Sequence, residues 1–188
     1  MDSSLLIPDA RVLDQAWERF GAGVELACHP FRNFTLATTD GSGLPQARLM
    51  TLRGVERDAG RLWLHSHQHS AKVMEITSNP AFAATFFDPE HMVSIRVRGT
   101  AACHLFDSAA LAEFSRGAVA AGRGNAADLL WPGSPDALQH AITRKAFREF
   151  VAIALTVDEL VWMQIAGGKV RHVRFREREG WQCEAMVD

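Results

Sequence analysis

The stretch HMVSIRVRGTAACHL, residues 91–105, carries the clearest alternating pattern in this 188-residue sequence. From Val93 to Ala101, apolar or small residues alternate with the polar residues Ser94, Arg96, Arg98 and Thr100. Successive side chains of an extended strand point to opposite faces, so one face of this strand is apolar and the other is strongly polar. The pattern predicts a strand that buries only one of its faces.

On both sides of this stretch, short runs of strand-forming residues alternate with turn signals such as Asp40-Gly41-Ser42-Gly43. We expect strands at 31–39, 44–53, 61–66, 81–87, 151–156, 160–165, 170–176 and 180–186. Many short strands in hairpin order, with few helices between them, argue against a doubly wound parallel sheet. Closure into a barrel removes exposed edges. The sequence therefore predicts a mainly β fold, a β-barrel with peripheral α-helices.

We expect helices at 8–23 and 70–78, and two more that begin near Asp107 and Ser134. Apolar residues recur at helical spacing in the first of them, and Gly21 and Gly23 are expected to end it. The glycine-rich segment 117–133 is interpreted as a surface or active-site loop. With no internal repeat in the sequence, residues 1–188 are interpreted as a single domain.

Composition excludes several classes of protein. The formal net charge of −2 argues against a general electrostatic attraction to nucleic acid or to an anionic membrane. Cys28, Cys103 and Cys183 have no paired spacing, which indicates reduced thiols rather than disulfides or a zinc site. The first ten residues lack a signal-peptide pattern, and no apolar run approaches the roughly 20 residues that span a bilayer. We therefore expect a cytoplasmic protein with neither nucleic-acid nor membrane partners.

The strand RLMTLR, from Arg48 to Arg53, is the first candidate for a binding site. Its middle is apolar on both faces, and an arginine stands near each end. Such a strand suits a position between a barrel core and a ligand or partner, where arginine offers a rigid fork of donors to a phosphate. The alternative is that both arginines are solvated strand ends.

The second candidate is the junction HSHQHSAK, residues 65–72, where a strand gives way to a helix. Free backbone N–H groups and the positive end of the helix dipole would lie beside Ser66, Ser70 and Lys72, which makes an anion site. Ordinary capping by Ser70 is the alternative. His65, His67 and His69 share a strand face, but no carboxylate or cysteine nearby in sequence completes a metal site, so we expect no bound metal.

Two further polar sets lie on strands. Ser94, Arg96 and Arg98 form one face of the alternating strand, and the C-terminal segment carries Trp162, Arg171, His172 and Arg174. Solvated arginine ladders are the alternative to ligand binding at both places. The sequence has no Ser-His-Asp, Cys-His or HExxH arrangement, so hydrolytic chemistry has little support. Basic groups that bind anions suggest that a bound cofactor performs the chemistry.

Taken in order, these segments resemble the pyridoxamine 5'-phosphate oxidase family of FMN-binding split barrels. The resemblance rests on the strand 48–53, the junction 64–72 with the following Asn79-Pro80, the run RVRGTA at 96–101, and Trp162 with HVRF at 172–175. It departs from the family pattern at Ala71 and Val170, where arginines are usual, and at Ser94, where a glutamine is common.

This resemblance implies a homodimer with FMN at the interface. It implies cofactor contacts at Arg48, Leu49, Met50, Thr51, Leu52, Arg53, His65, Ser66, Ser70, Lys72, Ser94, Trp162 and Arg174. Arg48, Ser66 and Lys72 would hold the phosphate, and Trp162 and Arg174 would come from the partner subunit. Arg53 and His172 would orient a small anionic substrate and serve as the catalytic pair.

The leading hypothesis is therefore an FMN-dependent oxidoreductase acting on an unidentified small molecule. A flavin-binding or sensing protein without catalysis is the second hypothesis. A barrel that handles haem, suggested by the three histidines at 65, 67 and 69, is the third.

Overall fold

The alternating stretch forms the middle strand of the sheet. In the computed structural model, which describes residues 9–105, 107–120 and 147–186, β6 spans Val93–His104. It pairs antiparallel with β5 (Ala81–Asp88) on one edge and with β7 (Phe150–Ala166) on the other. Its apolar residues at alternate positions are buried, as the sequence predicted.

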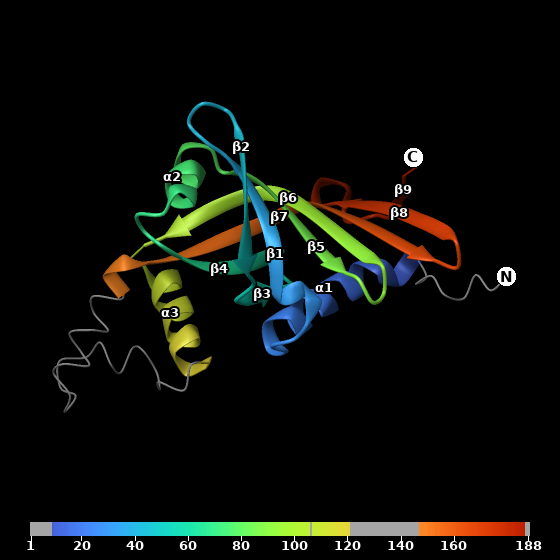
Figure 1. The fold of residues 1–188 in the computed structure, drawn as a ribbon, viewed down its shortest axis with the longest axis horizontal. Helices are drawn as coiled ribbons and strands as arrows, with labels where there is room; N and C mark the ends of the chain where they lie inside the picture. The colour runs from blue at the N-terminus through green and yellow to red at the C-terminus, as the bar shows by residue number, and fades with distance from the viewer. Residues whose placement is uncertain (1–8, 106, 121–146, 187–188) are drawn as a thin grey trace.

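The described residues form one nine-stranded sheet in which every pairing is antiparallel, in the order β2-β1-β5-β6-β7-β4-β3 (Figure 1). The other strands are β1 (Asn33–Thr39), β2 (Pro45–Thr51), β3 (Gly54–Glu56), β4 (Arg61–His67), β8 (Lys169–Arg176) and β9 (Glu184–Ala185). On one edge, the first half of β7 pairs with β4 and its second half pairs with β8, which in turn pairs with β9.

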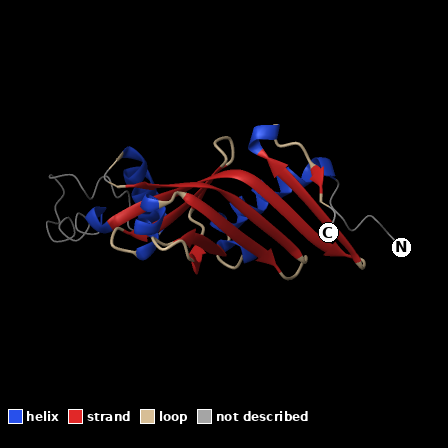
Figure 2. Cartoon of the chain, turned by 90° about the horizontal axis from the view of Figure 1, so that it is seen from above, coloured by secondary structure: helices blue, strands red, loops and turns tan. Residues whose placement is uncertain are grey.

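The two ends of this strand order, β2 and β3, are joined in the chain by Leu52 and Arg53 alone. The N–H of Arg53 donates to the carbonyl of Trp63 on β4 at 2.8 Å, and the N–H of Leu52 donates to the carbonyl of Arg32 at 2.8 Å. The sheet therefore curls back on itself at this link. A mainly β barrel with peripheral helices is confirmed, and Figure 2 shows the helices around the strands.

The core lies on the inner face of the sheet, where α1 (Asp9–Glu25) packs through the buried residues Val12, Ala16, Trp17 and Phe20. Phe20 meets Phe86 of β5 with ring centroids 4.8 Å apart, and Phe86 stacks on Phe34 at 4.4 Å. The short 3₁₀-helix η2 (Pro30–Arg32) adds Phe31 to this cluster. Each buried aromatic contributes about 1.5–3 kcal/mol, so α1 is an integral part of the barrel.

The N-terminal helix corrects one expectation. It was expected over 8–23 with two glycines at its end, but α1 continues through Gly21 and Gly23 to Glu25. A Cβ added at Gly23 would lie 2.9 Å from the backbone carbonyl carbon and oxygen of Phe31. Gly23 therefore permits close packing of η2 against the helix rather than ending it.

The other helices begin where they were expected. α2 spans Ala71–Ser78 and α3 spans Ser108–Ala120. Because α3 reaches residue 120, the first residues of the expected loop 117–133 are helical. The rest of that loop and the helix expected from Ser134 lie outside the described residues.

The strands expected at 151–156 and 160–165 are parts of one strand, β7. The register jumps from the pair Arg98–Glu159 to the pair Gly99–Val157, which leaves Asp158 as an extra residue in a β-bulge. Buried side chains are therefore odd-numbered up to Val157 and even-numbered from residue 160 to 164 on the inner face. The sequence pattern breaks at the bulge, although the strand does not.

At the C-terminal end, the strand expected at 180–186 is reduced to β9, which follows the 3₁₀-helix η3 (Glu177–Glu179). The three cysteines are free thiols, as expected. Among the residues that the structure describes, no helix has the length and apolar character needed to cross a membrane.

Candidate functional site

Arg48 lies on the inner face of β2, in the same cross-strand row as the buried residues Leu36 and Ala84. Its Nη2 donates to Oε2 of Glu75 on α2 at 2.8 Å, and its Nη1 contacts the hydroxyl of Thr38. The side chain of Arg48 is 22% exposed and that of Glu75 is 9% exposed. The guanidinium is thus fixed by buried groups while part of it stays accessible.

Ser66, Ser70 and Lys72 come together where β4 ends and α2 begins. Nζ of Lys72 donates to Oγ of Ser66 at 3.2 Å, and the hydroxyls of Ser66 and Ser70 lie 2.9 Å apart. Ser70 occupies the N-cap position of α2, yet its side chain makes no capping hydrogen bond to the helix. Its hydroxyl is therefore directed to the Ser66–Lys72 cluster instead of to the helix backbone.

Arg48 and this junction form one site, which we call the anion site (Arg48, Ser66, Ser70 and Lys72). Burial, and then the positive charge of Arg48, lower the pKa of Lys72, while Glu75 raises it. Two cations, two hydroxyls and the positive end of a helix therefore meet in a partly buried place. This donor set fits a phosphate group, because an anion there would compensate the net positive charge, and guanidinium, ammonium and hydroxyl groups all donate hydrogen bonds to phosphate.

The rest of the strand 48–53 divides by alternation. Met50 packs against the core and Leu52 is buried, whereas Leu49 is 71% exposed on the outer face beside half-buried Thr51. Arg53 is exposed in the link between β2 and β3. Within this strand, Arg48 is the residue that contacts α2, through its hydrogen bond to Glu75.

The three histidines of the junction contact different partners. Nε2 of His65 lies 3.1 Å from Oε2 of the buried Glu113 on α3, and Nε2 of His67 lies 3.3 Å from Oε2 of Glu149. The ring of His69 contacts that of His67. Sequence analysis missed both carboxylates, because they follow in the chain more than forty residues later. His65 and His67 are therefore each paired with a carboxylate from a separate segment of the chain.

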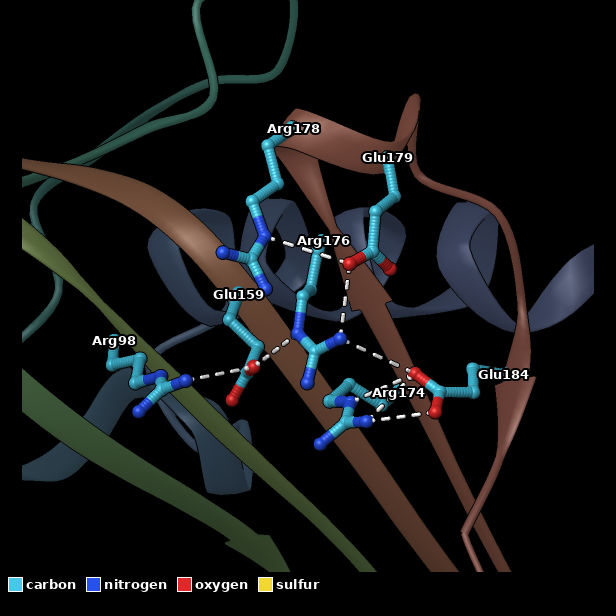
Figure 3. A network of polar contacts seen from close by, with 7 residues as sticks. All are labelled: Arg98, Glu159, Arg174, Arg176, Arg178, Glu179 and Glu184. Atoms are coloured by element: carbon cyan, nitrogen blue, oxygen red, sulfur yellow. Dashed lines mark hydrogen bonds and ion pairs between the residues drawn. The ribbon is translucent and has the colours of Figure 1, made fainter.

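Ser94, His172 and Arg174 share the outer face of the sheet. Ser94 and His172 both pair with Met163 of β7, and Arg96 and Arg174 both pair with Val161. Figure 3 shows the network beside them: Arg98, Glu159, Arg174, Arg176, Arg178, Glu179 and Glu184. Arg174 donates to both carboxylate oxygens of Glu184 on β9, with Nη2–O distances of 2.8 and 2.7 Å, and these bonds lower the pKa of Glu184.

The resemblance implies that Trp162 contacts the flavin of a partner subunit, and in this chain the residue lies in the core. It sits on the inner face between Ile95 and Val173, and none of its side chain is exposed. Its Nε1 is buried without a hydrogen-bond partner, and the guanidinium carbon of Arg19 lies 5.8 Å from its ring centroid. The ring therefore packs in the core of its own chain.

Arg48 and Arg174 do not meet in one chain. Arg48 lies on the inner face of the sheet, in a row of cross-strand neighbours that runs from β2 to Phe175 on β8. Arg174 lies on the outer face, in a row that runs from β8 to Leu49 on β2. Figure 1 places α2, which packs against Arg48, and β8, which carries Arg174, at opposite ends of the molecule. A single ligand can therefore contact both only if two chains contribute.

Glu75 and Thr38 belong to the site, although sequence analysis did not single them out. Thr38 is 3% exposed and Glu75 is 8% exposed. The one available signal was helical spacing, since Glu75 follows Lys72 by three residues and so shares its helix face. The partner that buries this carboxylate, Arg48, comes from a strand 27 residues away in sequence.

Fold and site define a class of protein: a split β-barrel with a cluster of cationic and hydroxyl side chains at the start of α2. The sequence profile of pyridoxamine 5'-phosphate oxidase matches residues 28–160, and the chain belongs to this family. A pyridoxine/pyridoxamine 5'-phosphate oxidase of Legionella pneumophila is 38% identical over 64 residues, which are 34% of this chain and 29% of that protein. The chain thus aligns with less than a third of that relative's length.

Solved structures share the fold. A pyridoxamine 5'-phosphate oxidase-related, FMN-binding protein of Nostoc punctiforme matches with a TM-score of 0.67 and 19% identity, over 97% of this chain and 99% of that one. PhzG of Burkholderia lata, solved with tetrahydrophenazine-1-carboxylic acid, matches with a TM-score of 0.69 and 18% identity, over 98% of both chains. At such identities, these likenesses establish the split-barrel fold.

Proposed function

We propose that this protein binds FMN through its phosphate at the anion site and acts as an FMN-dependent oxidoreductase on a small anionic substrate. The observation that carries the proposal is the cluster of Arg48, Lys72, Ser66 and Ser70 at the start of a helix. Family membership supports it, as does the structural neighbour from Nostoc, which is described as an FMN-binding protein. When bound, FMN would supply hydride or electron transfer, and the protein would position it.

The opposite placement of Arg48 and Arg174 supports a homodimer in which each site takes residues from both chains. His172 and Arg174 of a second copy would then face the flavin that Arg48 and Lys72 hold, and Arg53 would lie at its exposed edge. Ser94 shares the face of His172 and would join that side of the site. The Burkholderia neighbour was solved with a carboxylic acid, in keeping with an anionic substrate. We also propose a cytoplasmic location, which the three free thiols support.

A second candidate function is flavin binding without turnover. Arg174 is already engaged by both oxygens of Glu184, and Val170, which is 56% exposed, stands where the family pattern has an arginine. This version predicts bound FMN that neither NAD(P)H nor pyridoxamine phosphate reduces. Steady flavin reduction by either donor would exclude it in favour of an oxidoreductase.

The test compares FMN and riboflavin, which differ by the phosphate. Flavin fluorescence or absorbance titrations should give a lower Kd for FMN in the wild type. K72M should raise the Kd for FMN by about 10- to 100-fold, because a charge-assisted contact contributes about 1.5–3 kcal/mol. K169M, which removes an exposed lysine from the β7–β8 hairpin, is the matched control and should leave both values unchanged. Equal affinity for both flavins, or no binding, would contradict the proposal.

A further inference from the structure

Glu75 brings a negative charge into the anion site. It follows Lys72 by three residues on α2, so both side chains extend from one face of the helix. Its Oε2 accepts a hydrogen bond from Nη2 of Arg48 at 2.8 Å, and the hydroxyl of Thr38 donates to the same oxygen. With 8% of the residue exposed, water screens this carboxylate only weakly.

The charges of the site show what Glu75 does to an incoming phosphate. Arg48 and Lys72 carry two positive charges, and Glu75 cancels one of them. A phosphate monoester carries about −1.5 to −2 charges near neutral pH and is held best by charge-assisted hydrogen bonds. Glu75 occupies one N–H of the Arg48 fork and repels the phosphate, so it opposes the binding that the two cations favour.

We propose that Glu75 is an internal competitor for Arg48: it cancels one of the two positive charges of the anion site when no ligand is bound and weakens the hold on the phosphate, so that bound FMN exchanges with free flavin. This inference rests on the proposed function. Ala71, exposed at the first position of α2, adds no further cation to offset Glu75. The site therefore holds FMN with one net positive charge from these three groups.

A purely positioning role for Glu75 predicts the opposite sign. If the carboxylate only orients Arg48, its removal loosens the guanidinium and weakens FMN binding. E75Q separates the two roles, because glutamine keeps an oxygen acceptor for Arg48 and loses the charge. E18Q is the matched control, since it makes the same change at an exposed glutamate of α1, outside the anion site.

The experiment measures the Kd of FMN and of riboflavin for the wild type, E75Q and E18Q by flavin fluorescence. We expect E75Q to lower the Kd of FMN by about fivefold or more, from the removal of one nearby like charge, and to leave riboflavin within about twofold. E18Q should leave both Kd values within about twofold. FMN should also raise the melting temperature of E75Q by more than that of the wild type. An unchanged or higher Kd of FMN in E75Q would overturn the inference.

A measurement on the unmodified protein guards against a variant that fails to fold. Wild-type protein loaded with FMN and dialysed against flavin-free buffer should lose most of its flavin absorbance. Full retention would overturn the exchange role even if E75Q could not be purified. If neither flavin binds any variant, or if the wild type binds both equally, the proposed function fails and this inference falls with it. If the wild type prefers FMN to riboflavin but E75Q binds FMN no more tightly than the wild type does, the inference is refuted and the proposed function stands.

Discussion

Replacing Gly99 by alanine should destabilise the barrel more than any ordinary surface substitution. Gly99 lies on β6 opposite the bulge of β7, and a Cβ there would lie 2.0 Å from the carbonyl oxygen of Thr156 and 2.9 Å from the N of Asp158. Cβ atoms essentially never come closer than 3.0 Å to another heavy atom. Since both neighbours are backbone atoms, no side-chain rotation relieves the clash, and the two strands must separate by about 1 Å.

The expected loss of stability follows from this displacement. Overpacking a well-packed site costs about 1–3 kcal/mol, and each ladder hydrogen bond weakened beside it adds about 0.5–1.5 kcal/mol. Alanine also lowers the conformational entropy of the unfolded chain, which offsets about 0.4–1 kcal/mol of this loss. We therefore expect G99A to lower the free energy of unfolding by about 3 kcal/mol. For a chain of this size, that corresponds to a fall of about 6–12 °C in Tm.

Urea denaturation followed by circular dichroism measures this loss, and a thermal melt gives the matching shift in Tm. G41A is the matched control, because a Cβ on Gly41 meets nothing within 4 Å; its free energy of unfolding should stay within about 0.5 kcal/mol of the wild type. A G99A protein as stable as G41A would refute the steric account of the bulge.

Two further changes test the core and its edge. F86A removes a fully buried ring that contacts Phe20, Phe31 and Phe34, and should lower the free energy of unfolding in urea by about 3–5 kcal/mol; a loss below about 1 kcal/mol would contradict this packing. Burial would raise the pKa of Asp88, but hydrogen bonds from Arg19 and His91 outweigh it and lower that pKa. The stability that ionised Asp88 gives to the folded state is therefore fully present above about pH 4, the pKa of Asp88 in the unfolded chain. It is lost as the pH falls through the lower pKa of the folded state. D88N should lower the free energy of unfolding by about 3 kcal/mol at pH 7, since it leaves Arg19 without its charged partner. In thermal melts at decreasing pH, the Tm values of wild type and D88N should converge below about pH 4. A difference that is constant with pH would refute the electrostatic account.

Local pattern was enough to predict most strands, because each buries one face and so alternates in sequence. β6 ran within two residues of its expected bounds, and α2 within one. Pairing was not predictable in this way. That β4 lies against β7, for example, depends on packing between segments more than eighty residues apart. Alternation also could not predict that β7 is one continuous strand, because the extra residue Asp158 reverses the alternation without ending the strand.

The anion site shows the same division. Arg48 and Lys72 were recognisable as cations at a strand and at a helix start, and the structure brings them together. The place of Glu75 in the site was not predictable, because it depends on the contact with Arg48, which comes from a separate strand. The resemblance implied a flavin contact for Trp162, and the burial of its ring in the core was not predictable from alternation, which gives the residues that share a face but not which face packs against the core.

The pairing of β6 with β7 has a consequence for how much the chain can vary in length. His104 and Ala152 are cross-strand partners, so the segment between them leaves the sheet and returns to the same place. The entropy of closing such an excursion grows only with the logarithm of its length, and doubling the segment costs about 0.6 kcal/mol. Added residues in this connection should therefore destabilise the fold only slightly. The link of Leu52 and Arg53 has no such freedom, because an added residue would shift β2 against β3 and open the barrel.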